Sequence, residues 1–126
     1  MTERRVLVVD DEDDIREVAQ VSLEMLAGWT VLTARSGSEA LAKAQDQQPD
    51  AILLDVMMPD MDGPTTFLEL QKNEHTRHIP VILLTAKVQA ADRRRFSELG
   101  VASMIAKPFD PLKLADEVAA ALGWDR

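Results

Sequence analysis

Three features are missing from this sequence, and each absence narrows the possible functions. There is no cysteine among the 126 residues, which excludes disulfides, thiol catalysis and cysteine-ligated metal. Positive charge is in deficit, because 14 lysine and arginine residues stand against 22 aspartate and glutamate residues, for a net charge of −8. Nucleic acids and anionic membranes both bind basic surfaces, so we expect no direct contact with either.

Long apolar runs are the third missing feature. The N-terminal arginines are followed by an apolar run of only four residues, 6–9, which is too short for a signal peptide, and no stretch approaches a membrane span. We therefore expect a cytoplasmic location. With 46% apolar residues, a chain of this length can bury one hydrophobic core. No linker or repeat divides it, so we expect a single domain over residues 1–126, with no output domain in this chain.

Short apolar runs alternate with helix-like segments along the chain. The runs have strand length and mostly lack polar alternation, as in strands covered on both faces; they are residues 6–9, 30–34, 51–54, 80–86 and 102–106. The segments between them carry helical spacing or helix start and stop signals; they cover about 15–26, 36–47, 64–73, 88–99 and 111–122. Parallel strands require crossover connections. The pattern predicts an α/β fold, a (βα)5 doubly wound parallel five-stranded sheet with helices on both faces.

Polar side chains stand at the carboxyl end of most of the predicted strands. In sheets of this kind ligands bind at that edge, so residues far apart in the sequence are expected to meet there. Asp10 and Asp11 follow the first strand, Asp55 the third, Thr85 the fourth and Lys107 the fifth. Three carboxylates, one hydroxyl and one ammonium are therefore expected at one edge of the sheet.

This set of side chains is suited to phosphoryl transfer. Three neighbouring carboxylates would retain protons unless a cation were present. Oxygen-only ligation favours Mg²⁺, or another hard divalent cation such as Mn²⁺. An aspartate beside such an ion can attack phosphorus and form an aspartyl-phosphate. Thr85 and Lys107 can then contact the remaining phosphoryl oxygens, so the parts suffice for transfer to Asp55.

Simpler interpretations remain for single residues. An aspartate pair after a strand is often a helix N-cap, and a lone strand-end threonine or lysine is often structural. The methionines at 57, 58 and 61 fit loop or gap-filling roles. A calcium-binding loop is excluded, because with Gly63 as its sixth position the first position falls on Met58. The strand-end residues indicate a site only when taken together.

Four motifs together resemble the receiver domain of two-component response regulators. They are VLVVDDE (6–12), LLDVMMPDMDG (53–63), PVILLTA (80–86) and KPF (107–109), in order and at family-like spacings over essentially the whole chain. The resemblance implies a flavodoxin-like sheet with strand order 2-1-3-4-5. It implies that Asp55 is the phosphoacceptor, that Asp11 binds the metal directly, that Asp10 acts largely through metal-bound water and that Met57 contributes its backbone carbonyl.

The resemblance also assigns the rest of the site. Thr85 and Lys107 would bind the phosphoryl group, Gly63 would be structural in the loop after the third strand, and a cis bond is expected at Lys107–Pro108. Phosphoryl lifetime would be tuned at positions 57 and 87. Many receivers carry a tyrosine or phenylalanine three residues before the lysine as a rotating switch. This chain has Met104 there, so the aromatic part of the switch is missing.

The expected function is a phosphorylation-controlled signalling domain, not a turnover enzyme on an external substrate. Family members assist their own phosphorylation and dephosphorylation. The implied partners are a sensor histidine kinase or phosphotransfer protein, and an unknown output protein or a missing output domain.

Three alternatives are disfavoured by particular residues. A phosphatase of the haloacid-dehalogenase type would carry a second aspartate where Met57 stands. A nucleotide or flavin binder would need a glycine-rich or hydroxyl-rich loop, not the acidic stretch 10–14, after the first strand. A receiver that signals without phosphorylation is disfavoured because all five site residues are present.

Overall fold

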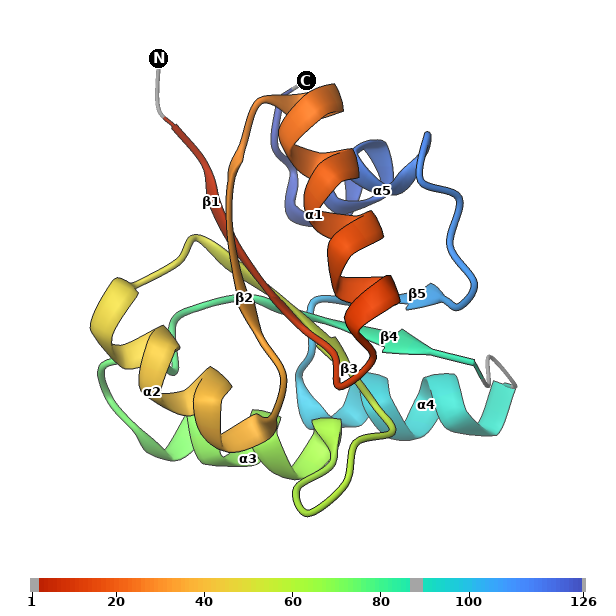
Figure 1. Ribbon diagram of the computed structural model, residues 1–126. Coiled ribbons are helices and arrows are strands. Elements are labelled where there is room, and N and C mark those ends of the chain that lie inside the picture. The colour runs from red at the N-terminus through yellow and green to blue at the C-terminus, as the bar shows by residue number, and fades with distance from the viewer. Residues whose placement is uncertain (1–2, 87–89, 126) are drawn as a thin grey trace.

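The computed structural model describes residues 3–86 and 90–125, which form a five-stranded sheet with helices on both faces (Figure 1). The strands are β1 (Arg5–Val9), β2 (Thr30–Ala34), β3 (Ala51–Asp55), β4 (Val81–Thr85) and β5 (Ser103–Ala106). The helices are α1 (Asp13–Ala27), α2 (Gly37–Gln47), α3 (Gly63–Lys72), α4 (Ala90–Leu99) and α5 (Leu114–Leu122). Strands and helices alternate throughout, as the sequence pattern predicts.

The sheet is parallel and has the order β2-β1-β3-β4-β5. β1 and β3 lie next to each other near its centre, with Val9 opposite Leu54 in the register. Every residue of β3 is buried, which explains why its sequence is an apolar run without polar alternation. The predicted fold class and strand order are confirmed.

The helices form two layers, one on each face of the sheet. In Figure 1, α1 and α5 lie together on one face, and α2, α3 and α4 cover the other. Successive strand residues point to opposite faces, so Leu54 packs in the core on the α2–α4 side with Phe67, whereas Leu53 packs with Leu23 on the α1–α5 side. Burying each such side chain contributes about 1.5–3 kcal/mol. The two cores hold the strand ends in fixed positions.

Two helix starts follow from local side-chain chemistry. The Ser36 hydroxyl accepts a hydrogen bond from the Glu39 backbone N–H at the start of α2, as its sequence predicts. Asp62 does the same for the Thr65 N–H at the start of α3, at 2.8 Å.

The last helix differs from its prediction. It begins at Leu114 and not near Pro111, because residues 111–113 form a turn. The Asp110 carboxylate accepts a hydrogen bond from the Leu112 N–H at 2.9 Å, and the Lys113 N–H bonds to the Asp110 carbonyl at 2.9 Å. The Ser22 hydroxyl of α1 donates to the Pro111 carbonyl, which fastens this turn to α1. The expected start of the fourth helix, at residue 88, lies outside the described residues.

The two tryptophans lie at the edge of the sheet where the strands begin. The rings of Trp29 and Trp124 are 5.2 Å apart in an edge-to-face arrangement, and the Arg4 guanidinium lies 4.5 Å from the Trp124 ring centroid. Trp29 directly precedes β2 and Arg4 directly precedes β1, so this cluster is at the opposite edge from Asp55. Within residues 3–86 and 90–125, none of the helices combines the length and apolar character needed to cross a membrane.

Candidate functional site

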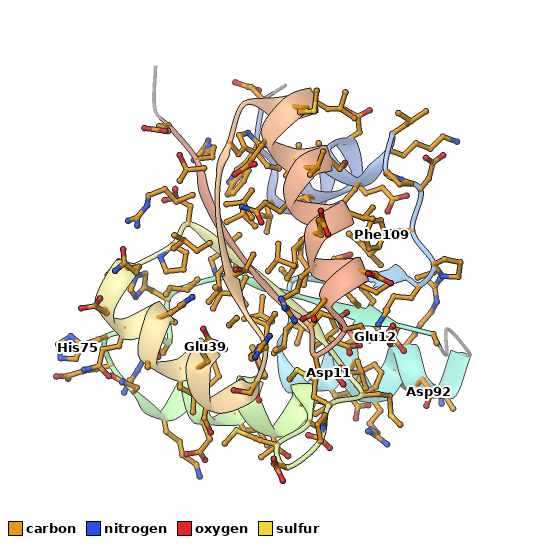
Figure 2. The ribbon with its side chains drawn as sticks, viewed as in Figure 1. Asp11, Glu12, Glu39, His75, Asp92 and Phe109 are labelled. Carbon is orange, nitrogen blue, oxygen red and sulfur yellow. The ribbon has the colours of Figure 1, made fainter. Side chains whose placement is uncertain are left out.

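The carboxyl ends of β1, β3, β4 and β5 bring the predicted site residues to one edge of the sheet. Asp55 is the last residue of β3, and Asp10 follows β1 directly beside it. Thr85 ends β4 opposite Ala106 of β5, and the Lys107 N–H donates to the Thr85 carbonyl at 2.9 Å. Figure 2 shows Asp11 next to Glu12 in the connection from β1 to α1, at this same edge.

Three carboxylates form an acidic cluster at this edge. Asp10, Asp11 and Asp55 each offer an oxygen, and these oxygens all lie within 4.8 Å of one another. Asp10 and Asp55 are buried, at 0% and 3% exposure, whereas Asp11 is exposed. Burying two neighbouring carboxylates away from bulk water is unfavourable unless a cation or a proton compensates their negative charge.

Lys107 supplies one compensating charge. Its ammonium group lies 3.0 Å from an Asp10 carboxylate oxygen and 3.2 Å from an Asp55 carboxylate oxygen. Burial alone would lower the pKa of Lys107, but the adjacent carboxylates of Asp10 and Asp55 outweigh it and raise that pKa. The lysine is therefore charged and lies between the two aspartates.

A single ammonium does not fully offset the acidic charge at Asp55. Burial, and then the charge of Asp10, raise the pKa of Asp55 from the ordinary 3.8 to about 6, although Lys107 and the Met57 backbone N–H act in the opposite direction. The metal-free site therefore has unbalanced negative charge at neutral pH. A bound divalent cation would remove that imbalance.

The donor set fits Mg²⁺. Magnesium takes oxygen ligands at about 2.0–2.1 Å in an octahedron, so two ligands on opposite sides are about 4.2 Å apart. The oxygens of the acidic cluster lie within 4.8 Å of one another, which is close to that spacing. Because Asp11 is exposed, an ion held by this cluster would be open to solvent, which suits an ion that keeps several waters.

Asp10 does not cap α1, which removes the simpler interpretation of the aspartate pair. The Asp10 carboxylate accepts a hydrogen bond from the Glu12 N–H at 2.9 Å and so closes a local turn. The N-cap of α1 is Glu12, and no side chain caps that helix start. The pair is therefore placed by the turn between β1 and α1.

Three of the remaining predicted site residues, Met57, Gly63 and Pro108, lie close to Asp55. Met57 is exposed, at 73%, in the loop after β3. Gly63 lies against β3, since a Cβ atom there would be 2.4 Å from the Asp55 carbonyl oxygen. The Lys107–Pro108 peptide bond is cis. Met104 is half-buried and packs against the core on the α2–α4 side, and position 87 lies outside the described residues.

A small cleft opens next to Asp55 and was not apparent from the sequence. It has a volume of about 310 Å³, and its lining includes Asp55, Lys107, Glu12, Ile15 and Pro108. Ile15 and Pro108 add apolar walls, which come from α1 and from the connection after β5. The cleft has room for a phosphoryl group next to the acidic cluster.

Arg16 contacts Asp10 of the cluster, although no sequence motif singles it out. Its guanidinium donates to the Asp10 carbonyl at 2.8 Å and forms an ion pair with Asp13. The hydrogen bond and the charge of Arg16 lower the pKa of the Asp13 carboxyl, and Arg35 lowers it further. The i, i+3 spacing of Asp13 and Arg16 was the available signal.

Several other polar residues lie outside the site. Asp62 caps α3, and Asp60 is an exposed loop residue with φ of 70°. Figure 2 shows His75 at the left edge of the molecule, well away from Asp11, and both histidines are exposed. The arginines at 93–95 are exposed on α4, as expected for a solvated helix face.

Comparison with known proteins gives the same family that the motifs indicate. Residues 6–119 match the response regulator receiver domain. The chain is 40% identical to the phosphate regulon transcriptional regulatory protein PhoB of Pseudomonas aeruginosa, over 97% of this chain and 53% of that protein. It is also 40% identical to the alkaline phosphatase synthesis transcriptional regulatory protein PhoP of Bacillus subtilis, over 94% of this chain and 48% of that protein. The chain thus spans about half the length of these curated relatives.

Two crystal structures show the likeness in three dimensions. The chemotaxis protein CheY4 of Vibrio cholerae superposes with a TM-score of 0.88 at 32% identity, covering 95% of this chain and 99% of that one. The receiver domain of a sensor histidine kinase from Pseudomonas aeruginosa superposes with a TM-score of 0.84 at 30% identity, covering 97% and 99%. That second structure has a magnesium ion coordinated in its active site cleft.

Proposed function

This chain belongs to the response regulator receiver family, the phosphoacceptor domains of two-component signalling, and from that premise we propose that Asp55 is the residue that accepts the phosphoryl group. The observation that supports this most is the position of Asp55. It is a buried carboxylate at the end of the central strand β3, and it lines a cleft beside two further aspartates and a lysine. Of the three aspartates in the acidic cluster, Asp55 alone lines that cleft.

The reaction is transfer from a phosphohistidine of a partner protein. A carboxylate oxygen of Asp55 attacks phosphorus, the new O–P bond forms, and the P–N bond to the donor imidazole breaks with its electron pair returning to nitrogen. The Lys107 ammonium and the Thr85 hydroxyl contact the oxygens of the transferred group. Because Lys107 already lies within 3.2 Å of Asp55, it needs only a small movement to do so.

We propose that Asp11 and Asp55 ligate Mg²⁺ directly, together with the Met57 carbonyl, and that Asp10 acts through bound water. When bound, the ion neutralises charge on the carboxylates and on the phosphoryl oxygens. Asp10 and Asp55 hold their positions through the turn at Glu12 and through Lys107. Receiver proteins are signalling proteins, so the phosphoryl group on Asp55 is a signal and not the product of a turnover enzyme.

A surface beside the cleft has the character of a docking site for the phosphodonor. A groove of about 420 Å³ lies along α1, and its lining includes Val18, Val21 and Met25 of that helix, together with Leu112. Met25 and Leu112 are 79% and 73% exposed, unusual values for large apolar side chains. The groove continues the apolar wall of the cleft, because Val18 follows Ile15 by one helical turn. We propose that the protein carrying the donor histidine, a histidine kinase or phosphotransfer protein, covers this groove.

Output is proposed to use the face formed by α4, β5 and α5. Phosphorylation would draw Thr85 toward the phosphoryl group and bias this face between two states. Met104 stands on β5, with Phe96 of α4 in the same core cluster, so a change at Thr85 can reach α4 through this core. A backbone NMR comparison with and without a phosphoryl mimic tests this, and shifts confined to the metal pocket would refute it. The output itself would come from another protein or domain.

The assignment of Asp55 is tested by labelling with a small phosphodonor in Mg²⁺. The wild-type protein is expected to gain one phosphoryl group by intact-mass analysis, and Asp55→Asn to gain none. Asp60→Asn is the matched control, because Asp60 is an exposed aspartate in the neighbouring loop, and it should label like wild type. Labelling of Asp55→Asn at the wild-type level would show that another residue is the acceptor.

A further inference from the structure

Both terminal nitrogens of the Arg16 guanidinium form contacts near the β1–α1 connection. One terminal nitrogen donates to the Asp10 backbone carbonyl at 2.8 Å, and the other pairs with the Asp13 carboxylate. The Arg16 side chain is only 14% exposed, whereas that of Asp13 is 74% exposed, so the bond to the Asp10 carbonyl is the better shielded of the two. A planar guanidinium can bridge two acceptors in this way, whereas the single ammonium of a lysine cannot present the same fork.

A positively charged side chain is unfavourable at this position of the helix. Arg16 lies in the first turn of α1, where the helix dipole favours negative side chains and disfavours positive ones. It also stands next to a site that we propose binds a divalent cation. A positive charge there repels that ion, and the ion pair with Asp13 does not account for the second hydrogen bond of Arg16, to the Asp10 carbonyl. A residue that breaks a local rule near a site often has a positional task there.

What Arg16 does is indicated by the hydrogen bonds of the Asp10 backbone. Its N–H donates to the Ala34 carbonyl at 3.1 Å, and its carbonyl accepts from Arg16. That carbonyl belongs to the planar peptide unit that leads into Asp11. Fixing the carbonyl therefore fixes the plane from which the Asp11 backbone, and with it the Asp11 carboxylate, departs.

We propose that Arg16 is a positioning residue for the metal site, holding the Asp10–Asp11 peptide so that the Asp11 carboxylate faces Asp55. This inference rests on the proposed function, since it assumes that the acidic cluster binds Mg²⁺. Arg16 itself does not touch the ion or the reacting atoms. It acts through the backbone of the residues that do.

The two possible roles of the arginine predict opposite changes in Mg²⁺ affinity when Arg16 is replaced. If Arg16 acts only as a charge, removing it increases the local negative potential and Mg²⁺ binds more tightly. If it positions Asp11, removing it weakens binding, by about tenfold as for other groups that orient metal ligands. Arg35 provides the matched control, because its guanidinium lies 3.4 Å from the same Asp13 carboxylate but its side chain is 69% exposed.

The experiment is a Mg²⁺ titration of wild type, Arg16→Gln, Arg16→Lys and Arg35→Gln, followed by the backbone amide signals of residues 10–12. Thermal unfolding in EDTA, run in parallel, measures the stability of each metal-free fold. We expect Arg16→Gln and Arg16→Lys to bind Mg²⁺ about tenfold more weakly. We expect Arg35→Gln to bind as tightly as wild type or more tightly.

Arg16→Lys keeps the charge, so it decides the question if Arg16→Gln fails to fold. Wild-type affinity in Arg16→Lys, or unchanged or tighter binding in a folded Arg16→Gln, would overturn the inference. Absence of Mg²⁺ binding in the wild-type protein would instead refute the proposed metal site. The failure of the inference and the failure of the proposed function are therefore distinguishable.

Discussion

Replacing Asp55 by asparagine should stabilise the metal-free protein at neutral and alkaline pH. The burial of Asp55 and its proximity to Asp10 raise its pKa from 3.8 to about 6, so ionising this carboxyl in the folded protein is harder than in the unfolded chain. A pKa raised by this amount corresponds to about 3 kcal/mol between the two protonation states. Because Asp55 is only 3% exposed, screening by solvent removes little of this energy.

The direction of this pH dependence follows from how tightly the folded and the unfolded protein bind the Asp55 proton. Between pH 3.8 and about 6 the folded protein holds the Asp55 proton more tightly than the unfolded chain does, so stability falls as the pH rises through this window. Above this pH window the ionised Asp55 carboxylate destabilises the folded protein by the full amount, about 3 kcal/mol. Near pH 4 only a small part of this destabilisation remains. Asparagine cannot ionise, so it avoids the cost at every pH.

The assay is urea unfolding of wild type and Asp55→Asn in EDTA at pH 8, 5 and 4. We expect the variant to be more stable by up to about 3 kcal/mol at pH 8, by about half of that at pH 5 and by little at pH 4. Asp60→Asn, in an exposed loop, should change stability by less than about 0.5 kcal/mol throughout. An Asp55→Asn protein no more stable than wild type at pH 8, or a difference independent of pH, would refute this account of the site.

Three other predictions concern the metal, the loop and the groove. Mg²⁺ at a hundred times its dissociation constant should stabilise wild type by about 2.7 kcal/mol in urea unfolding, and Asp55→Asn by clearly less; equal gains would place the ion elsewhere. Gly63→Ala should cost about 1–3 kcal/mol in the same assay, because its Cβ would meet the Asp55 carbonyl at 2.4 Å, and a neutral result would contradict that packing. Val21→Asp should slow phosphorylation by a cognate protein donor but not by a small phosphodonor; equal effects on both would argue against docking in the groove.

The order of the strand-end residues follows directly from the sequence. Apolar runs without alternation indicate buried parallel strands, and the polar residue after each run marks its carboxyl end, so Asp10, Asp55, Thr85 and Lys107 could be assigned to one edge. This works because strand length, burial and the direction of parallel strands are local or topological properties. Helix starts at Ser36 and Asp62 are likewise local, since the capping side chain and the backbone N–H that donates to it lie three residues apart.

The distances and charges of the site are decided only by the tertiary structure. Lys107 reaches Asp10 and Asp55 across 97 and 52 residues of sequence, and the raised pKa of Asp55 depends on burial by elements that come from the whole chain. The hydrogen bond from Arg16 to Asp10 could not be predicted either, because its acceptor is a backbone carbonyl, a group that every residue has and no sequence motif distinguishes. The sequence by itself thus determined which side chains meet at the edge of the sheet. Packing decided how closely they meet, because burial and distance, and hence charge, are properties of the assembled core.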